Sequence, residues 1–510
     1  MGLIAKVNGA AIYGVEALSI VIEVRTDPGT PSFQIIGLGD NSVKESRERV
    51  CSAIIQSGFD LPDRVLVNLA PADLKKEGGG FDLPIAIGIL VSSKQLSKDF
   101  VDNFTFLGEL SLNGALKALK GAIAAGIESQ RAGRKAIVVS EQNGVETSLV
   151  SGVVCAPCAS LSHVVSFLIG ESDPSPIQQK ALSVNRDNTK NLDDVWGQDS
   201  AKRALKIAAT GGHNILMIGP PGCGKSMLAE RFPLILPELT REEMLESIKI
   251  HSVVGLSITK LLNGERPYRN PHYAVSEAGL IGGGSPPRPG EITLAHNGVL
   301  FLDELPEFRR GALEALRLPL ESAGLNIARS KGTVHFPARF QLIAAMNPCP
   351  CGRLGSDDHK SPCACSSYEI ANYLKKISQP ILDRIDLHVE LSAVPVSGLT
   401  EVRKKRVNAE DLSTEIKRLH DLQRSRFGIL NAYLDSDRLN QSLLLSAQSL
   451  TILDKASERL QLSARGFVRV LRVARTIADI AGSKGVELEH LSEALSYRGL
   501  ERLKVIKGIR

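Results

Sequence analysis

Short apolar runs separated by helical patterns fill the first third of the chain. Three of these runs predict β-strands: LSIVIEVRT at 18–26, RVLVNLAP at 64–71 and KAIVVSE at 135–141. The segment 41–58 has a longer period and predicts a helix with four apolar residues on one side: Val43, Val50, Ile54 and Ile55. Strands that alternate with helices predict an α/β domain over residues 1–170.

The rest of the chain divides into three further parts. The segment 171–190 is polar and contains proline, which predicts a linker. Residues 191–395 again combine strand and helix patterns, whereas residues 396–510 are helical to near the end of the chain. We therefore expect two α/β domains joined by a linker, followed by a helical domain.

Composition is that of a soluble globular protein, with 43% hydrophobic and 23% charged residues. The net charge of +5 permits nucleic acid as a partner but does not require it. No apolar run approaches the roughly 18 residues of a membrane span, and the N-terminus is not typical of a signal peptide. Eight cysteines in 510 residues argue against a disulfide scaffold. We expect a cytoplasmic protein without membrane contact.

The segment HNILMIGPPGCGKS has the phosphate-loop spacing GxxxxGK[ST] between an apolar strand and a helix. Backbone amides of such a loop face phosphates. The predicted ATP-binding loop consists of Gly219, Pro220, Pro221, Gly222, Cys223, Gly224, Lys225 and Ser226. Lys225 should reach the β and γ phosphates, and Ser226 should ligate Mg²⁺. The alternative, a glycine-rich loop without a ligand, does not account for the complete strand–loop–helix context.

Two further buried strands end in polar residues that suit ATP hydrolysis. GVLFLDE ends in Asp303, which would hold Mg²⁺ directly or through water, and in Glu304, which would be the general base on the attacking water. FQLIAAMNP ends in Asn347, whose amide can orient that water. A turn residue before Pro348 is the alternative for Asn347.

Longer stretches of the sequence resemble one protein family. NPHYAVSEAGLIGGGSPPRPGEITLAHNGVLFLDELPEF at 270–308 and SQPILDRIDLHVEL at 378–391 are similar to AAA+ ATPases of the magnesium-chelatase-like branch. Four more stretches resemble the bacterial YifB/ComM family: VWGQDSAKRALKIAATGGHN, LSARGFVRVLRVARTIADIAG, FQIIGLGDNSVKESRERV and NLAPADLKKEGGGFDLPIAIGIL. Nearly the whole chain is covered. The resemblance implies a Lon-protease-like (ribosomal S5 domain 2-like) N-terminal domain, an AAA+ core and a C-terminal helical lid.

The resemblance also assigns roles to arginines. ILDRIDL matches the arginine-finger segment, so Arg384 is implied to act on the neighbouring subunit's γ phosphate, where its charge stabilises the transition state. A surface pair with Asp383 is the alternative. LSARGFVRVLRVAR matches the lid helix of the second sensor arginine, implied to be Arg465. Arg465, Arg469 and Arg472 share one helix face, and a solvated face is the alternative for one or two of them.

Two family insertions are placed at 253–297 and 325–340. In ring translocases such loops face the pore, and Arg329 and Lys331 at the turn of the second insertion are implied to grip DNA phosphates without reading sequence. A plain surface turn explains these residues equally well. By family position, residues 195–198 should line the adenine pocket.

A cysteine-rich segment follows Asn347 directly. CPCGRLGSDDHKSPCAC at 349–365 contributes four thiols that could form a tetrahedral Zn²⁺ site: Cys349, Cys351, Cys363 and Cys365. His359 is a substitute ligand or an idle neighbour, and a cluster of reduced thiols without metal is the alternative. Cys155 and Cys158 form a C-x-x-C with no second pair, and we interpret them as structural.

The catalytic dyad of Lon proteases is missing from the N-terminal domain. Such proteases use a serine nucleophile with a lysine base, but the nucleophile position here holds Phe81 or Asp82, and the lysine position holds Ile123. Lys117 and Lys120 are near but out of register. We therefore predict no peptidase activity and a domain retained for binding and ring formation.

The leading hypothesis is an ATP-driven hexameric DNA motor. Family membership implies a branch-migration helicase that acts on single-stranded and branched DNA during natural transformation, with recombination proteins as further partners. ATP and Mg²⁺ are the expected cofactors, and Zn²⁺ is a third. A protein-remodelling or magnesium-chelatase-type ATPase is the alternative, and an ATP-dependent peptidase is disfavoured by the missing dyad.

Overall fold

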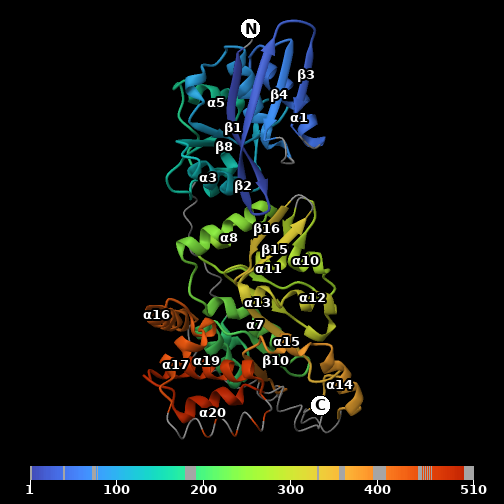
Figure 1. Ribbon diagram of the computed structural model, residues 1–510, viewed down its shortest axis with the longest axis vertical. Coiled ribbons are helices and arrows are strands. Elements are labelled where there is room, and N and C mark those ends of the chain that lie inside the picture. Colours follow the sequence, from blue (N-terminus) through green and yellow to red (C-terminus); the bar gives the residue numbers. More distant parts are fainter. Residues whose placement is uncertain are drawn as a thin grey trace.

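Figure 1 shows the computed structural model of the protein, an elongated molecule with its N-terminal domain at the top and a helical domain at the bottom. The structure describes residues 3–37, 41–71, 76, 78–177, 191–285, 287–329, 332–354, 362–393, 409–445 and 451–498, the last range with gaps at 452, 454, 456, 457, 459 and 461. In the described part, no helix combines the length and the apolar character needed to cross a membrane. The predicted linker at 171–190 lies mostly outside this part.

The N-terminal domain is built on a mixed seven-stranded sheet. Its strands run in the order β3 (Ser32–Ile36), β4 (Arg64–Ala70), β2 (Glu16–Asp27), β1 (Ile4–Tyr13), β5 (Phe104–Phe106), β8 (Ala136–Ser140) and β9 (Val154–Cys158). The helices of this domain are α1 (Asn41–Gln56), α2 (Asp82–Ser92), α3 (Ala122–Arg131), α4 (Gly144–Thr147) and α5 (Leu161–Leu168), and a short hairpin joins β6 (Glu109–Leu110) to β7 (Leu116–Lys117). The three predicted strands and the predicted helix are confirmed.

One part of the helix prediction is wrong. Val50 and Ile54 of α1 are fully buried, but the side chain of Ile55 is 56% exposed. Ile54 lies one turn beyond Val50 and so shares its face, whereas Ile55 is rotated a further ~100° towards solvent. The side chain of Val43 lies outside the described residues.

Strands β1 and β2 form a long antiparallel ribbon. Their pairing runs from Ile4↔Arg25 to Tyr13↔Glu16, where the chain turns through Gly14 and Val15. In Figure 1 this ribbon extends from the N-terminal sheet down to the hairpin of β15 and β16 in the next domain. Helix α3 also meets that domain, because Ile123 packs in one apolar cluster with Ile248.

The phosphate-loop domain, residues 191–393, has a five-stranded parallel sheet. Its strands run in the order β11 (Tyr268–Arg269), β14 (Val299–Leu302), β17 (Gln341–Met346), β10 (Ile215–Ile218) and β18 (Leu387–Glu390). Every residue of β10, β14 and β17 is buried, as expected for central strands covered on both faces. Parallel strands bring their carboxyl ends to one edge of the sheet, and the predicted Asp303, Glu304 and Asn347 all follow strand ends there.

Helices and short strands surround this sheet. They are α6 (Asp199–Gly211), α7 (Lys225–Ile235), α8 (Arg241–Val254), α9 (Thr259–Leu262), α10 (Glu277–Ile281), β12 (Gly282–Gly283), β13 (Arg288–Pro289), α11 (Glu291–Leu294), α12 (Arg310–Ala315), α13 (Pro319–Ser322), β15 (Gly324–Arg329), β16 (Gly332–Pro337), α14 (Ser367–Lys375) and α15 (Gln379–Leu382). The antiparallel pair β15–β16 lies within the predicted insertion 325–340 and extends one residue before it.

The helical domain, residues 409–498, shares its core with the phosphate-loop sheet. Its helices are α16 (Ala409–Phe427), α17 (Ser436–Leu443), α19 (Ala464–Ala481) and α20 (Leu488–Ser496). Ala474 and Ile477 of α19 pack in the same apolar cluster as Ile215 of β10. A buried ionic contact adds to this packing, because Arg469 Nη1 lies 2.5 Å from Asp386 Oδ1, just before β18. The helical domain is therefore firmly attached to the sheet.

Candidate nucleotide-binding site and cysteine cluster

The loop 219–226 has the backbone shape that its glycines permit. Gly222 and Gly224 have φ values of 77° and 96°, in the left-handed region that favours glycine. A Cβ on Gly219 would lie 2.7 Å from the carbonyl oxygen of Leu391, so the loop start also has no room for a side chain. Helix α7 begins at Lys225, directly after the loop. Its free amides point at the loop, which is the arrangement that binds phosphate.

The Lys225 ammonium lies at the centre of the loop. It donates to the carbonyl oxygens of Gly219 at 2.7 Å and Pro220 at 2.9 Å. It also lies 3.3 Å from Asn347 Oδ1, which comes from the end of the neighbouring strand β17. The structure thus brings together two residues that the sequence placed on separate motifs. All three partners are neutral oxygens, so phosphate oxygens can replace them at a gain in charge complementarity.

The two predicted magnesium ligands are in direct contact. Ser226 Oγ donates to Asp303 Oδ2 at 2.8 Å, across from helix α7 to the end of β14. The hydroxyl and carboxylate oxygens are the ligands that Mg²⁺ prefers, and the pair fits a shared ion with phosphate. Glu304 follows Asp303, is exposed, and donates its backbone N–H to Asp303 Oδ1 at 2.9 Å.

Glu304 adopts a backbone conformation that L-residues rarely use. Its φ of 53° and ψ of 47° lie in the left-handed region. Such strain costs on the order of 1–3 kcal/mol and is concentrated at functional sites. Because the side chain is exposed beside the Ser226–Asp303 pair, the strained turn presents the carboxylate to solvent where the predicted general base would activate water.

The first and last residues of the segment 195–198 lie against the phosphate loop. The Gln198 side-chain amide donates to the carbonyl oxygens of Cys223 at 3.1 Å and Ser392 at 2.7 Å. Val195 is buried, and a Cβ on Gly224 would lie 3.1 Å from its Cγ1 atom. The segment is therefore next to the loop, as the predicted adenine pocket requires.

Arg384 is buried and paired within its own chain. Its Nη2 atom lies 2.5 Å from Glu321 Oε1, and its remaining nitrogens donate to two backbone oxygens, of Pro380 at 2.6 Å and Arg317 at 3.1 Å. The side chain of Arg384 is 6% exposed, whereas that of Glu321 is 50% exposed. The surface pair with Asp383, considered as an alternative, is not what the structure shows, because Asp383 instead accepts from Gln379. Glu321 was missed from the sequence because no motif spacing marks it.

The three arginines of α19 have different environments. Arg465 is exposed in the first turn. Arg469 pairs with Asp386, and Arg472 donates to the carbonyl oxygen of Leu434 at 2.5 Å. Burial lowers the pKa of Arg472. A solvated face is therefore the wrong explanation for Arg469 and Arg472. Arg469 holds the helical domain to the phosphate-loop domain, and Arg472 makes a contact within the helical domain.

The predicted DNA contacts lie largely outside the described part of the chain. Arg329 is the last residue of β15 and pairs with Gly332, but its side chain is not among those described. Lys331 lies outside the described residues altogether, as does His359. The roles of Arg329 and Lys331 stay predictions.

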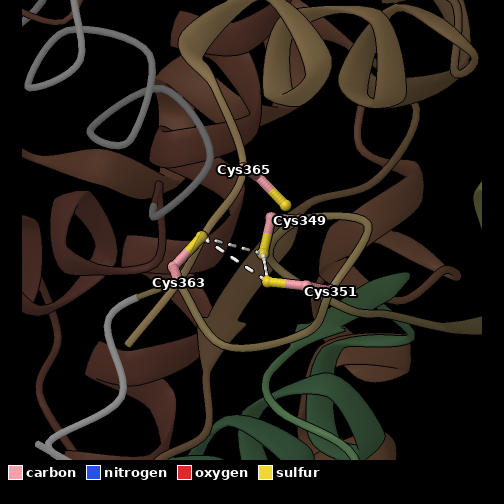
Figure 2. Close-up of side chains that lie close together, drawn as sticks. All are labelled: Cys349, Cys351, Cys363 and Cys365. Atoms are coloured by element: carbon pink, nitrogen blue, oxygen red, sulfur yellow. Dashed lines mark hydrogen bonds between the residues drawn. The ribbon is translucent and has the colours of Figure 1, made fainter. Parts of the chain in front are cut away.

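Figure 2 shows that the four cysteine side chains of the segment 349–365 converge. The Sγ atoms of Cys349, Cys351 and Cys363 are 3.4, 3.6 and 3.7 Å apart, and all four sulfur atoms, with Cys365, lie within 4.8 Å of one another. Thiolates around a tetrahedral Zn²⁺ at about 2.3 Å are separated by about 3.8 Å. The donor set and its spacing therefore fit zinc.

The four thiols of the cysteine cluster have different environments. A hydrogen bond from the backbone N–H of Arg353, opposed by burial, lowers the pKa of Cys351 to about 6, whereas burial raises the pKa of Cys349 to about 12. The case for a metal site therefore rests on the geometry of the four sulfur atoms. The cluster also touches the phosphate loop. Gly352 has a φ of 75°, and a Cβ there would lie 2.8 Å from Cδ of Pro221.

The positions of the Lon dyad are filled by buried residues. Phe81 and Ile123 are at most 1% exposed. The Asp82 carboxylate is fully buried and accepts from Arg49 Nε at 2.6 Å and from Arg49 Nη2 at 3.0 Å, as well as from the backbone N–H of Leu110. Burial raises the pKa of Asp82, and the contacts with Arg49 oppose this. The ion pair with Arg49 was not predicted, since the two residues lie on α1 and α2 without a motif.

The remaining thiols and lysines fit structural interpretations. Burial raises the pKa of both Cys155 and Cys158 to about 12, so these thiols stay protonated. Lys117 lies 3.5 Å from Glu109 on the short β6–β7 hairpin. None of these described contacts forms a nucleophile–base pair.

Comparisons with known proteins cover nearly the whole chain. Three segments match magnesium chelatase families: residues 22–143 match "subunit ChlI of Mg-chelatase", residues 191–399 match "magnesium chelatase, subunit ChlI", and residues 407–498 match its C-terminal family. The chain is 42% identical over 506 residues to the competence protein ComM of Haemophilus influenzae, with 98% of each protein covered. It is 42% identical over 503 residues to the protein YifB of Escherichia coli, again with 98% of each covered. It is also 25% identical over 331 residues to the magnesium-chelatase 38 kDa subunit of Rhodobacter capsulatus, covering 60% of this chain and 86% of that subunit.

Proposed function

The chain belongs to the ComM/YifB family of magnesium-chelatase-like AAA+ proteins, and from this we propose that it is an ATP-driven DNA motor. In this proposal it assembles as a hexamer in the cytoplasm and promotes branch migration when incoming DNA is integrated by homologous recombination. The similarity to a competence protein over 98% of both chains carries the proposal. A phosphate loop alone does not show on which substrate the free energy of ATP hydrolysis is used.

The residues around the phosphate loop support ATP hydrolysis. Lys225 would exchange the carbonyl oxygens of Gly219 and Pro220 for phosphate oxygens, and Asn347 would orient the attacking water. Ser226 and Asp303 would hold Mg²⁺, which neutralises charge that develops on the phosphates. Glu304 would accept the proton of the water, from the exposed position that its strained turn provides.

A ring arrangement supplies the remaining charge. Arg384 would act in the site of the neighbouring subunit, and Arg465, exposed at the start of α19, would act from the helical domain. Arg384 must first leave its carboxylate partner Glu321. Because Glu321 is half exposed, water can solvate it when the arginine leaves, which keeps the exchange inexpensive compared with that of a buried pair.

DNA would be held mainly through its backbone. Arg329 and Lys331, at the turn that the sequence predicts, are proposed to contact phosphates of single-stranded or branched DNA, and recombination proteins are further partners. Phosphate contacts release counterions, so DNA binding should weaken steeply with salt. The four cysteines would hold one Zn²⁺ with a structural role.

A protein-remodelling or chelatase-type motor is the second candidate. The family matches to magnesium chelatase over both the phosphate-loop and helical domains favour it. A chelatase function requires a second protein that carries the porphyrin, and a remodelling function requires an unfolded substrate. ATPase stimulation separates the candidates, because each partner should raise turnover only if it is the true substrate.

A migration assay tests the proposal. Purified protein is incubated with a labelled three-strand or Holliday-junction substrate, with and without ATP. ATP-dependent movement of the junction is expected, and Lys225→Ala should abolish it while leaving the fold intact. If the wild type hydrolyses ATP but neither responds to DNA nor moves the junction, while an unfolded protein stimulates hydrolysis, the second candidate replaces the first.

A further inference from the structure

The turn between β1 and β2 is inserted into the core of the phosphate-loop domain. Val15, at this turn, is 1% exposed and packs in one apolar cluster with Val334 and Phe336 of strand β16. Ile250 of α8 belongs to the same cluster. Figure 1 shows the long β1–β2 ribbon reaching the β15–β16 hairpin. A residue of the N-terminal domain thus completes the core on which this hairpin rests.

Gly14 makes this contact possible. Its φ of 66° lies in the left-handed region, and a Cβ there would be 2.4 Å from Val334 Cγ1 and 3.6 Å from Phe336 Cζ. Real Cβ atoms do not approach another heavy atom at 2.4 Å, so any side chain at position 14 must displace Val334. The glycine therefore sets the closest approach of the turn to the hairpin.

Contacts between the N-terminal domain and helix α8 fix the position of the β1–β2 turn. Lys249 Nζ lies 2.5 Å from Glu16 Oε1, directly beside the turn. The backbone N–H of Gly121, just before α3, donates to the Ser252 carbonyl oxygen at 3.2 Å and lies 3.0 Å from Ser252 Oγ. These contacts hold the N-terminal domain against α8. They therefore oppose a movement of the β1–β2 turn away from the β15–β16 hairpin.

The hairpin is less restrained beside this contact. A cavity of about 540 Å³ lies between the β1–β2 turn, α8 and strand β16. Thr333, His335 and Arg339 line it together with residues of the turn and of α8. On the opposite side the hairpin packs through Leu325 and Ile327 into the core of the phosphate-loop domain. On the side of the cavity, the contact of Gly14 and Val15 with Val334 joins the hairpin to the N-terminal domain.

The hairpin continues into the nucleotide site. Strand β16 ends at Pro337, and β17 begins at Gln341 and leads to Asn347. The Asn347 side chain lies 3.3 Å from the Lys225 ammonium. Strand β17 therefore connects the hairpin directly to the residue that is proposed to orient the hydrolytic water.

We propose that Gly14 and Val15 are positioning residues that hold the β15–β16 hairpin, so that the binding of DNA to the protein is sensed through this hairpin at Asn347. The N-terminal domain then serves as the fixed support against which the hairpin works. This inference rests on the proposed function, since it assigns the support of a DNA-contacting element.

The test compares Gly14→Ala with Gly58→Ala in the full-length protein. Both glycines belong to the N-terminal domain and have positive φ, 66° and 82°, but a Cβ on Gly58 would meet no described atom within 4 Å. The pair therefore separates the clash with Val334 from backbone strain. Basal and DNA-stimulated ATP turnover are measured with single-stranded DNA, together with thermal unfolding. We expect Gly14→Ala to keep basal turnover and to lose stimulation by roughly fivefold or more, the lower end of measured couplings between sites, and Gly58→Ala to behave as the wild type.

Two further variants keep the test decisive. Val334→Ala removes the Cγ1 atom that the new Cβ would strike but also reduces the apolar contact with Val15. Gly14→Ala with Val334→Ala should therefore recover part of the stimulation, to about the level of Val334→Ala alone, which general destabilisation would not predict. Val15→Ala shortens the apolar contact without a clash and should lose part of the stimulation, even if Gly14→Ala does not fold. If DNA does not stimulate ATP turnover of the wild-type protein, the proposed function is rejected. If DNA stimulates the wild type, Gly14→Ala and Val15→Ala equally, only the positioning role is overturned.

Discussion

Two α/β domains of this chain each place charged residues beside a glycine-rich segment, and they use these charges in opposite ways. In the phosphate-loop domain, Lys225 is held by neutral oxygens and Glu304 is exposed. In the N-terminal domain, Asp82 follows Gly78–Gly80 in sequence but is buried and paired with Arg49. Partners that a ligand can replace leave a site available for chemistry. A buried pair of opposite charges leaves only a structural contact.

The Arg384–Glu321 pair is an intermediate case. Arg384 is as buried as a structural arginine, yet its carboxylate partner is half exposed. The carboxylate of Asp82, by contrast, is fully buried. The comparison shows that an arginine can leave its ion pair more easily when the carboxylate left behind is exposed to water. Variants of the phosphate-loop site and of the Arg384–Glu321 pair should therefore change ATP turnover, whereas variants of the Arg49–Asp82 pair should change the free energy of unfolding.

The largest effect is expected from Arg384→Ala. If the arginine acts on the neighbour's γ phosphate, its loss should lower ATP turnover by about 1,000-fold or more, the range of arginine fingers, while ATP still binds. Turnover and nucleotide affinity are measured on assembled protein. Mixing this variant with Lys225→Ala should restore some activity at interfaces where an intact arginine meets an intact loop. Absence of rescue in confirmed mixed rings would count against a role in trans.

Glu304→Gln should lower turnover by about 100- to 10,000-fold, the contribution of a positioned general base. The amide cannot accept the proton of the water, but Lys225, Ser226 and Asp303 stay in place, so ATP affinity should be kept. Thermal unfolding should be unchanged because the side chain is exposed. Wild-type turnover in this variant would remove Glu304 from the mechanism.

Asp82→Ala should show the reverse pattern. The variant removes the carboxylate that pairs with Arg49, and breaking a buried ion pair typically costs about 3–5 kcal/mol of the free energy of unfolding. ATP turnover per folded molecule should stay at the wild-type level. Asp102→Ala is the control, because Asp102 and Lys98 form an exposed pair at 3.9 Å whose loss should cost under about 1 kcal/mol. Denaturant unfolding measures both, and equal costs would contradict the distinction.

The smallest effect on the fold is expected at the cysteine cluster. Purified, reduced protein should contain about one Zn²⁺ per chain, the stoichiometry of a four-thiolate site. Cys349→Ser and Cys363→Ser should each lose the metal, and DNA-stimulated hydrolysis should fall while the sheet survives. Cys51→Ser, in α1 and outside the cluster, should keep both. Protein prepared without chelator that contains no zinc would reject the site, and metal-free variants with full activity would reject the coupling.

Local patterns allowed much of the architecture to be predicted from the sequence. Strands such as β10 and β14 are short, wholly apolar runs that end in recognisable motifs, so Lys225, Ser226, Asp303 and Asn347 could be placed at one edge of the sheet. Contacts between distant segments could not be predicted. The pairs Arg384–Glu321 and Arg469–Asp386 join residues far apart in sequence, and only the packing of helices against the sheet brings them together.

The contact of Gly352 with Pro221 joins the cysteine cluster to the phosphate loop. Such a contact can couple binding at the two places, and any coupling between two binding sites is reciprocal. If metal in the cluster changes the affinity for nucleotide by some factor, nucleotide must change the affinity for metal by the same factor. A protein with this arrangement would hold its metal with different strength at different stages of the hydrolysis cycle, and the rate of metal release to a chelator would report which nucleotide is bound.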